Sequence, residues 1–344
     1  MQTLCGRAGL ALGSSDSPLR PVTVFHSFGD ADYAATATSK NDAVFKSGDP
    51  ECALAEISDP EVTRPPAFSD PYEARGYLKH RLAIACRIFA QFGFAEGIAG
   101  HITLRDPVDP TSFWVNPFGL HFSQIRDEDL ILVSESGCVI DGGRNRRLNH
   151  GMKTTKGSPL TTSNKAAYAI HAELHRARPD VNCAAHAHTM HGRAICSRAR
   201  PGLRMLTQDF CVFWRDLALH PSFAGVVLAA DEGRAIASAL GGRKAALLAS
   251  HGLLVAGASV EATVAWFVLL ERCCQVQLLA EAAAAGQGGG ADAAVVEIGD
   301  EEARATWEVM GSPEHGYLMG LPLFQVAERE FGEETYLGRG LEKR

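Results

Sequence analysis

The sequence predicts an α/β protein, and two observations support this class. Short apolar runs such as 113–115, 130–133 and 245–249 alternate with longer segments whose apolar residues recur at helical spacing, and strands that alternate with helices build α/β layers. Hydrophobic residues make up 46% of the 344 residues and charged residues 21%, an ordinary balance for a protein with a sizeable core. The length allows one large domain or two modest ones.

The N-terminal part divides into a tail and a helix followed by short strands. Residues 1–68 are rich in Ser, Asp, Ala, Thr and Pro without a sustained hydrophobic period, so we expect a disordered or weakly ordered tail. Helical spacing begins at Asp70, and Gly93 stands where this first helix should end. Strands are expected at 102–105, 113–115, 130–133 and 138–140, and together they predict a meander.

The remaining elements alternate up to residue 285. A polar loop is expected over 150–163, because this stretch contains two Gly and one Pro among polar residues. We expect helices at 163–178, 191–199, 231–240 and 260–285, and strands at 181–185, 225–228 and 245–249, with 253–255 continuing the last strand. The main domain is therefore placed at 69–285. Residues 286–344 are expected to form a linker and an extension that packs on the domain or on a neighbouring subunit.

Charge and cysteine content limit the partners. The formal charge is −7 and no polybasic run occurs, which argues against nucleic acid and membrane surfaces as partners and favours small molecules or other subunits. The apolar stretches near the C-terminal third are interrupted by Glu271, Arg272 and Glu281, too soon for a membrane span. Nine Cys occur without a CxxC spacing, which indicates reduced thiols and a cytoplasmic protein.

Two histidines at the end of an apolar run form a candidate metal half-site. His186 and His188 are two residues apart, so in an extended chain both imidazoles point to the same face. A catalytic zinc ion usually has three protein ligands and one open position. His251 is the third candidate, because it also ends an apolar strand, and Gly252 allows the backbone to turn away. The alternative for the pair is two histidines that only pack in the core, and the alternative for His251 is a capped or exposed residue at the end of a strand.

The segments around these histidines resemble a known family. The runs GHITLRDP, VNPFGLHFSQI, AIHAELHRARPDVNCAAHAHTMHG and LLASHGLLVAG are similar to the class II aldolase/adducin family over about residues 70–285. The resemblance implies a three-layer α-β-α domain with a central, mostly antiparallel or mixed nine-stranded sheet. It also implies a homo-oligomer, usually a tetramer, with active sites near subunit contacts.

The resemblance assigns a cofactor and a chemistry to the site. In the aldolase branch the corresponding histidines bind zinc, which maps onto His186, His188 and His251; Zn²⁺ is the expected metal here and Fe²⁺ the alternative. Three neutral imidazoles leave the charge of a divalent cation intact, so the cation can polarise a carbonyl and stabilise an enediolate. This is the chemistry of a lyase that cleaves a C–C bond beside a carbonyl.

The chain departs from the aldolase pattern in several places. Ala167 occupies the position of the family's acid/base Glu, and Glu173 lies almost two helical turns away from it. Phe118 stands where a phosphate-binding hydroxyl is expected, and Trp214 replaces a usual Tyr. A sugar phosphate is therefore not the expected substrate, and we expect a small, unphosphorylated carbonyl compound.

Two other residues are candidates for the chemistry of the site. Glu96, in the glycine-containing turn that approaches the substrate in aldolases, is the candidate for acid/base catalysis. His191 lies one helical turn beyond His188 and is expected to donate to or orient the substrate, with packing alone as the alternative. His171 and His175 are also four apart on one helix face, but the Glu of HAELH is misplaced for a zinc-protease base, so we expect these two to pack.

Three functions remain open at this point. The first is a metal-dependent, aldolase-like lyase. The second is a non-haem Fe(II) oxygenase of secondary metabolism, because three histidines without the Glu can hold iron with positions free for dioxygen and substrate. The third is an adducin-like oligomeric interaction module without catalysis.

Overall fold

The computed structural model describes residues 64–134, 136–143, 153–154, 162–223, 225, 230–286 and 295–331. All of them belong to one unit, Ala53–Arg344. The predicted N-terminal tail, 1–68, lies outside the described residues except for 64–68.

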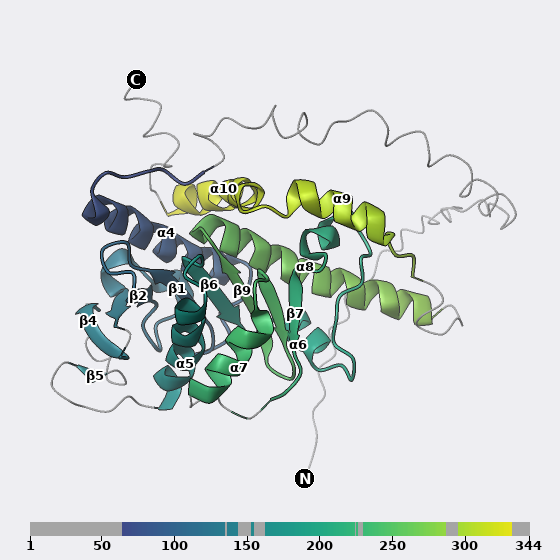
Figure 1. The fold of residues 1–344 in the computed structure, drawn as a ribbon, viewed down its shortest axis with the longest axis horizontal. Coiled ribbons are helices and arrows are strands. Elements are labelled where there is room, and N and C mark those ends of the chain that lie inside the picture. The colour runs from purple at the N-terminus through teal and green to yellow at the C-terminus, as the bar shows by residue number, and fades with distance from the viewer. Residues whose placement is uncertain are drawn as a thin grey trace, which may run out of the picture. The chain divides into compact units, whose positions relative to one another are not determined.

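A mixed β-sheet forms the centre of this unit (Figure 1). Its strand order is β5-β4-β3-β2-β1-β6-β9-β8-β7. The strands are β1 (His101–Arg105), β2 (Phe113–Val115), β3 (Ile131–Val133), β4 (Cys138–Gly142), β5 (Lys153–Thr154), β6 (Cys183–Ala187), β7 (Leu217–His220), β8 (Ala245–Leu248) and β9 (Gly252–Gly257). Only β4 with β5 and β7 with β8 pair in parallel. The predicted α/β class and mostly antiparallel sheet are confirmed, with eight strands of at least three residues and a ninth, β5, of two.

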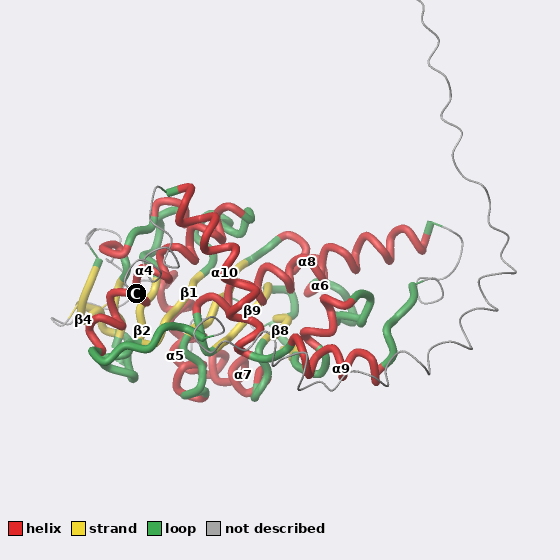
Figure 2. Tube along the Cα trace, turned by 90° about the horizontal axis from the view of Figure 1, so that it is seen from above, coloured by secondary structure: helices red, strands yellow, loops and turns green. Residues whose placement is uncertain are grey.

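Helices cover both faces of the sheet and give the three expected layers. Helices α5 (Thr162–Ala177) and α7 (Ala230–Leu240) pack together on one face. Helices α4 (Pro71–Gln91), α6 (Met190–Cys196) and α8 (Val260–Ala285) lie on the other face, and Figure 2 shows α8 running past α6. Short 3₁₀ helices at Phe122–Gln124, Asp127–Asp129 and Gln208–Phe213 connect these elements. Alternate residues of β6 therefore reach different layers, with Ala185 in the α4/α8 core and Ala184 in the α5/α7 core.

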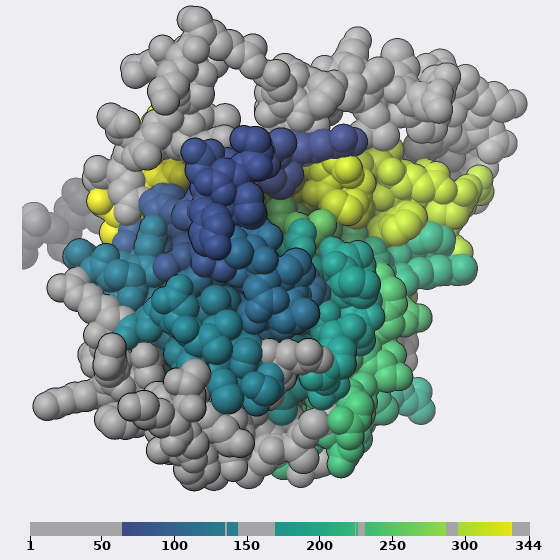
Figure 3. All heavy atoms as spheres, turned by 60° about the vertical axis from the view of Figure 1, so that its left-hand side comes forward, coloured from purple at the N-terminus to yellow at the C-terminus, as the bar shows by residue number. Residues whose placement is uncertain are grey.

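Two further helices lie outside these layers, one packed on α8 and the other on the 3₁₀ helix Gln208–Phe213. They are α9 (Asp300–Met310) and α10 (Pro313–Glu330), and α10 packs against both α8 and α4; Figure 3 shows α4 in purple next to this C-terminal pair in yellow. A buried ion-pair network joins the three helices, because Arg81 of α4 contacts Glu261 of α8 at 2.7 Å and also contacts Glu328 of α10. The C-terminal extension thus contributes to the core of the same chain.

Helix α8 is the one described helix that is long and apolar enough to cross a membrane by length and composition. In its most apolar window 61% of the residues are buried within the protein, as expected for the core helix of a layered domain. Ser259 caps its first turn by accepting a hydrogen bond from the Ala262 N–H at 3.2 Å.

Several predicted elements differ from the structure. Strand β6 begins two residues later than predicted and ends at Ala187, so His186 lies inside the strand. Residues 252–257 do not continue β8 but form the antiparallel strand β9 after a turn at 249–251. The predicted loop over 150–163 contains the short strand β5 and the start of α5, and otherwise lies outside the described residues, as does most of the predicted strand 225–228. Strand β7 was not predicted, because its four residues lie between charged and turn-forming segments.

Candidate metal centre

His186 lies inside β6 on the face covered by α5 and α7. Its side chain is 4% exposed, and the strand pairs it with His101 of β1 on one side and Leu254 of β9 on the other. The His186 Nδ1 atom is 2.8 Å from the carbonyl oxygen of Leu253. A carbonyl only accepts, so Nδ1 carries the proton and donates, and Nε2 is left as the free ligand atom.

The other two histidines complete a compact group, which we call the three-His site (His186, His188 and His251). His188 follows the end of β6, and His251 closes the turn between β8 and β9. Each residue offers one ligand atom, and these atoms all lie within 4.8 Å of one another. The ring centroids are 4.7 to 5.1 Å apart.

The turn that presents His251 is held under backbone strain. Ser250 has a φ of 55°, a left-handed conformation that is unusual for a residue with a side chain. The Ser250 N–H donates to the Cys196 carbonyl at the end of α6 at 2.9 Å, which holds the turn in place. Gly252 follows, and a Cβ there would meet the Ala187 carbonyl oxygen at 2.7 Å. The close approach of the two strand ends therefore requires glycine.

The electrostatics of the three-His site suit a divalent cation. Burial lowers the pKa of His186 well below its usual range, and His251 and His188 add to the effect. Burial, followed by the neighbouring His188, lowers the pKa of His251 to about 4. Burial also lowers the pKa of His188, ahead of Arg193. All three imidazoles are therefore neutral near pH 7 and keep their lone pairs available, as metal ligands must.

Two further histidines lie behind the site, and sequence reasoning missed their position. His101 is the cross-strand partner of His186, and burial followed by His188 lowers its pKa to about 4. Its ring centroid is 6.3 Å from that of His171 on α5. The Thr103 hydroxyl contacts His171 Nδ1 at 2.7 Å and His175 Nε2 at 2.9 Å. His171 and His175 are both buried, and the His175 ring stacks on Phe113.

His191, predicted to donate to or orient the substrate, has a buried carboxylate partner. His191 Nδ1 lies 2.9 Å from Glu271 Oε1 of α8, and the same carboxylate accepts from the His191 and Gly192 N–H groups at 3.0 and 2.8 Å and from the Thr189 hydroxyl. Glu271 is 5% exposed. The Glu271 carboxylate therefore caps the first turn of α6, which begins two residues after His188. Because Nδ1 of His191 is bound to it, Nε2 is the ring nitrogen left for a substrate. A charge inside an apolar helix was the only sequence signal for this role.

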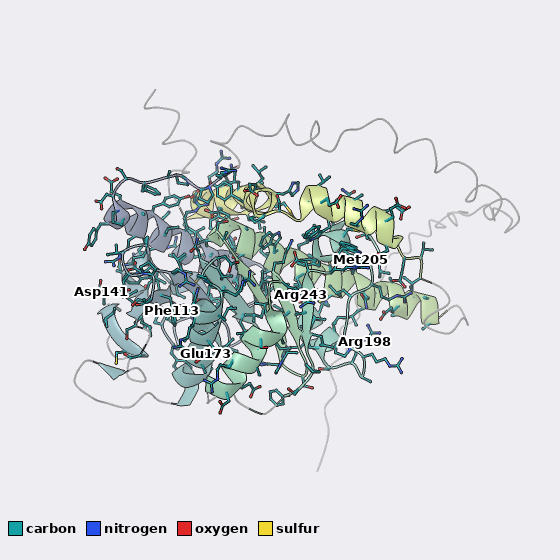
Figure 4. The ribbon with its side chains drawn as sticks, in the orientation of Figure 1. Phe113, Asp141, Glu173, Arg198, Met205 and Arg243 are labelled. Atoms are coloured by element: carbon teal, nitrogen blue, oxygen red, sulfur yellow. The ribbon has the colours of Figure 1, made fainter. Side chains whose placement is uncertain are left out.

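Glu96, the residue predicted for acid/base catalysis, forms a partly exposed ion pair beside the three-His site. Its Oε1 accepts from Arg193 Nη2 at 3.0 Å. Both charges act on the pKa of His188, Arg193 lowering it and Glu96 raising it. Glu173 of α5, labelled in Figure 4, pairs with Arg176 and Arg234 instead. The side chain of Ala167 lies outside the described residues.

Comparison with known proteins assigns the family. A family model described as "Class II Aldolase and Adducin N-terminal domain" matches residues 80–278, more than half of the chain. The chain belongs to the class II aldolase/adducin family. This confirms the resemblance carried by the histidine-containing runs.

Three similar proteins each match this chain over most of its length and over most of their own length. "Decarboxylase NovR" of Streptomyces niveus is 42% identical over 278 residues, which are 80% of this chain and 93% of the relative. "4-hydroxy-3-prenylphenylpyruvate oxygenase/4-hydroxy-3-prenylbenzoate synthase" of Streptomyces roseochromogenus subsp. oscitans is 42% identical over 277 residues, 80% and 90% of the two chains. The solved structure titled "L-fuculose 1-phosphate aldolase" from Glaciozyma antarctica has a TM-score of 0.67 and 40% identity, covering 80% of this chain and 98% of that one.

Proposed function

We propose that this protein is a metal-dependent lyase of the aldolase type that acts on a small, unphosphorylated carbonyl compound. The observation that carries the proposal is the three-His site, whose three ligand atoms lie within 4.8 Å of one another. The family assignment supports an enzyme that uses a divalent metal at such a site. We propose Zn²⁺ as that metal, because three neutral nitrogen ligands with an open position are typical of catalytic zinc.

The three metal-binding histidines and His191 have different proposed roles in the reaction. A divalent cation held by the three imidazoles would polarise the substrate carbonyl and stabilise the electron pair left when the neighbouring C–C bond breaks. His191 is the proposed acid/base, because Glu271 holds its Nδ1 at 2.9 Å and leaves Nε2 for a substrate proton.

The relatives bear on the substrate class. Two relatives at 42% identity are named as a decarboxylase and as an oxygenase of an arylpyruvate, and such 2-oxo acids are unphosphorylated carbonyl compounds. The structural neighbour at 40% identity is titled after a sugar phosphate, but Phe118 stands where a phosphate-binding hydroxyl would be expected. We therefore propose an aryl 2-oxo acid or a related aldol compound rather than a sugar phosphate.

An iron-dependent oxygenase is the second candidate. It is favoured by the printed activity of the Streptomyces roseochromogenus relative, which is named an oxygenase. The same three imidazoles suit Fe²⁺ as well as Zn²⁺. The two candidates differ in whether dioxygen is consumed.

One experiment separates these functions. Metal-free protein would be loaded anaerobically with Zn²⁺ or Fe²⁺ and offered phenylpyruvate, 4-hydroxyphenylpyruvate and L-fuculose 1-phosphate, with products followed by mass spectrometry and dioxygen by an electrode. The lyase predicts C–C cleavage of an unphosphorylated substrate with either metal and without dioxygen uptake. Uptake coupled to product formation with Fe²⁺ alone would establish the oxygenase, and turnover of the sugar phosphate alone would refute the proposed substrate class.

A cytoplasmic homotetramer remains our proposal for the working state. Seven cysteines in the described part of the chain are free thiols and six of them are buried, which suits a reducing compartment. Family members are typically oligomers, and size-exclusion chromatography with light scattering tests the subunit number.

A further inference from the structure

Arg193 is a cation placed beside the three-His site by helix α6. It lies five residues after His188, on the second turn of the helix. Its Nε donates to the carbonyl of Thr189, the residue that follows His188, at 3.3 Å. The guanidinium is therefore held beside the chain segment that carries this metal-site imidazole.

The guanidinium is held in position but keeps donors for another ligand. Its Nε donates to the Thr189 carbonyl at 3.3 Å, and its Nη2 donates to Glu96 at 3.0 Å. These bonds use two of the five N–H donors of an arginine. The side chain is 45% exposed and that of Glu96 is 37% exposed. A carboxylate arriving from solvent can therefore reach the planar donor edge, which binds carboxylates in a two-pronged manner.

Large apolar side chains are exposed on α6 and on the segments that adjoin Glu96 and His251. Ile98, two residues after Glu96, is 60% exposed, and Met190, at the start of α6, is 68% exposed. Phe223 is 51% exposed, and its ring centroid lies 6.0 Å from that of His251. Large apolar side chains exposed next to a polar centre mark a surface that contacts an apolar group. The combination suits a ligand with one anionic end and one apolar end.

We propose that Arg193 is the carboxylate-binding residue of the three-His site, and that Ile98, Met190 and Phe223 contact the aryl or alkyl group of the same substrate. In a 2-oxo acid the carboxylate is bonded directly to the carbonyl carbon, so its two binding groups must be neighbours, as Arg193 and His188 are. Glu96 is then a positioning residue that occupies part of Arg193 in the absence of substrate. The inference rests on the proposed function only in placing the substrate at the three-His site.

Binding of a matched pair of ligands tests the inference without any turnover. Isothermal titration calorimetry on the full chain, metal-free and zinc-loaded, would compare phenylpyruvate with its neutral methyl ester for the natural protein and for Arg193→Gln. The variant should bind phenylpyruvate about tenfold more weakly and the ester unchanged, since tenfold corresponds to about 1.4 kcal/mol, the order of one charge-assisted contact. Arg193→Lys, which keeps the charge and loses the planar fork, should fall between the two.

Two controls separate this role from a structural one. Arg198→Gln removes a cation that is 37% exposed, lies just beyond the same helix and pairs with Glu281 (Figure 4), and it should leave both affinities unchanged. Glu96→Gln removes the competing carboxylate and should strengthen phenylpyruvate binding. Arg193→Gln protein that melts like the natural protein yet binds phenylpyruvate within twofold of it would overturn the inference, and so would a natural protein that does not prefer the acid to its ester. Arg193-dependent binding without C–C cleavage would reject the lyase and retain the carboxylate site.

Discussion

Replacing Glu271 by Gln should destabilise the start of α6, although it changes only one atom of the side chain. The carboxylate accepts four hydrogen bonds: Oε1 from the His191 N–H at 3.0 Å and Nδ1 at 2.9 Å, and Oε2 from the Gly192 N–H at 2.8 Å and the Thr189 hydroxyl at 2.5 Å. An amide offers one oxygen, and its NH₂ group cannot accept. In either orientation of the amide, one backbone N–H of the first turn therefore loses its acceptor.

The magnitude follows from the burial of this group. A buried donor left without a partner costs about 1–3 kcal/mol, and loss of a negative charge at the start of a helix costs roughly 0.3–2 kcal/mol. We expect the Glu271→Gln variant to lose about 2–4 kcal/mol in its free energy of unfolding. The Thr189 hydroxyl limits the loss, because it can rotate and accept from the new NH₂ group.

Denaturant unfolding followed by circular dichroism measures this loss as a lower midpoint at an unchanged slope. Glu281→Gln is the matched control on the same helix, since its carboxylate pairs with the partly exposed Arg198 and should cost less than about 1 kcal/mol. Nitrogen-15 shifts of His191 provide a second readout, because an amide NH₂ group placed at Nδ1 would donate to this nitrogen and favour the tautomer protonated at Nε2. A loss no larger than in the control, together with unchanged shifts, would refute the assigned role of Glu271.

Two further predictions concern acid stability and the turn at the metal site. Burial lowers the pKa of His101 to about 4 and that of His175 to about 3. Below about pH 6.5 the unfolded chain therefore takes up protons before the folded protein does, and the free energy of unfolding of the metal-free protein should fall by about 2 kcal/mol per histidine between pH 8 and pH 5. A flat stability profile in denaturant titrations over this range would contradict this prediction. Gly252→Ala should move the strand ends apart and weaken zinc binding in a chelator competition, because the added Cβ would lie 2.7 Å from the Ala187 carbonyl oxygen. Gly242→Ala is the control and should bind zinc normally, because a Cβ there has no atom within 4 Å. Equal zinc affinities in the two variants would contradict the steric reason for a glycine at 252.

Local sequence patterns predicted much of the fold and the three residues of the three-His site. The spacing of His186 and His188 placed both on one face of a strand whatever its exact limits, so a two-residue error in the start of β6 did not affect the prediction. His251 was found because it follows an apolar strand and precedes a glycine. The long helices were predicted closely, since α7 and α8 have strong boundaries at Gly241 and Ser259.

Long-range pairing accounts for what the sequence could not provide. His101 is separated by 85 positions from His186, and only the pairing of β1 with β6 makes them neighbours. Glu271 and His191 are likewise 80 positions apart, and only the packing of α8 against α6 brings them into contact. The β8–β9 turn was read as one strand because its apolar runs are separated by only three residues. Helices α9 and α10 were not predicted individually, because their positions depend on long-range packing: α10 packs on α8 and joins the Arg81 network, and α9 packs on the 3₁₀ helix Gln208–Phe213.

Elemental analysis of the purified protein tests directly whether the three-His site holds a metal. The full chain would be purified anaerobically without added metal and analysed by elemental mass spectrometry beside His186→Ala, His188→Ala and His251→Ala, with His175→Ala as a control whose ring nitrogen instead contacts Thr103. We predict close to one equivalent of zinc per chain, lost in the three site variants and kept in the control. Iron in the same proportion would select the oxygenase. Absence of metal from all five proteins, even after reconstitution with zinc or iron, would contradict a metal enzyme and leave an adducin-like interaction module as the function of this chain.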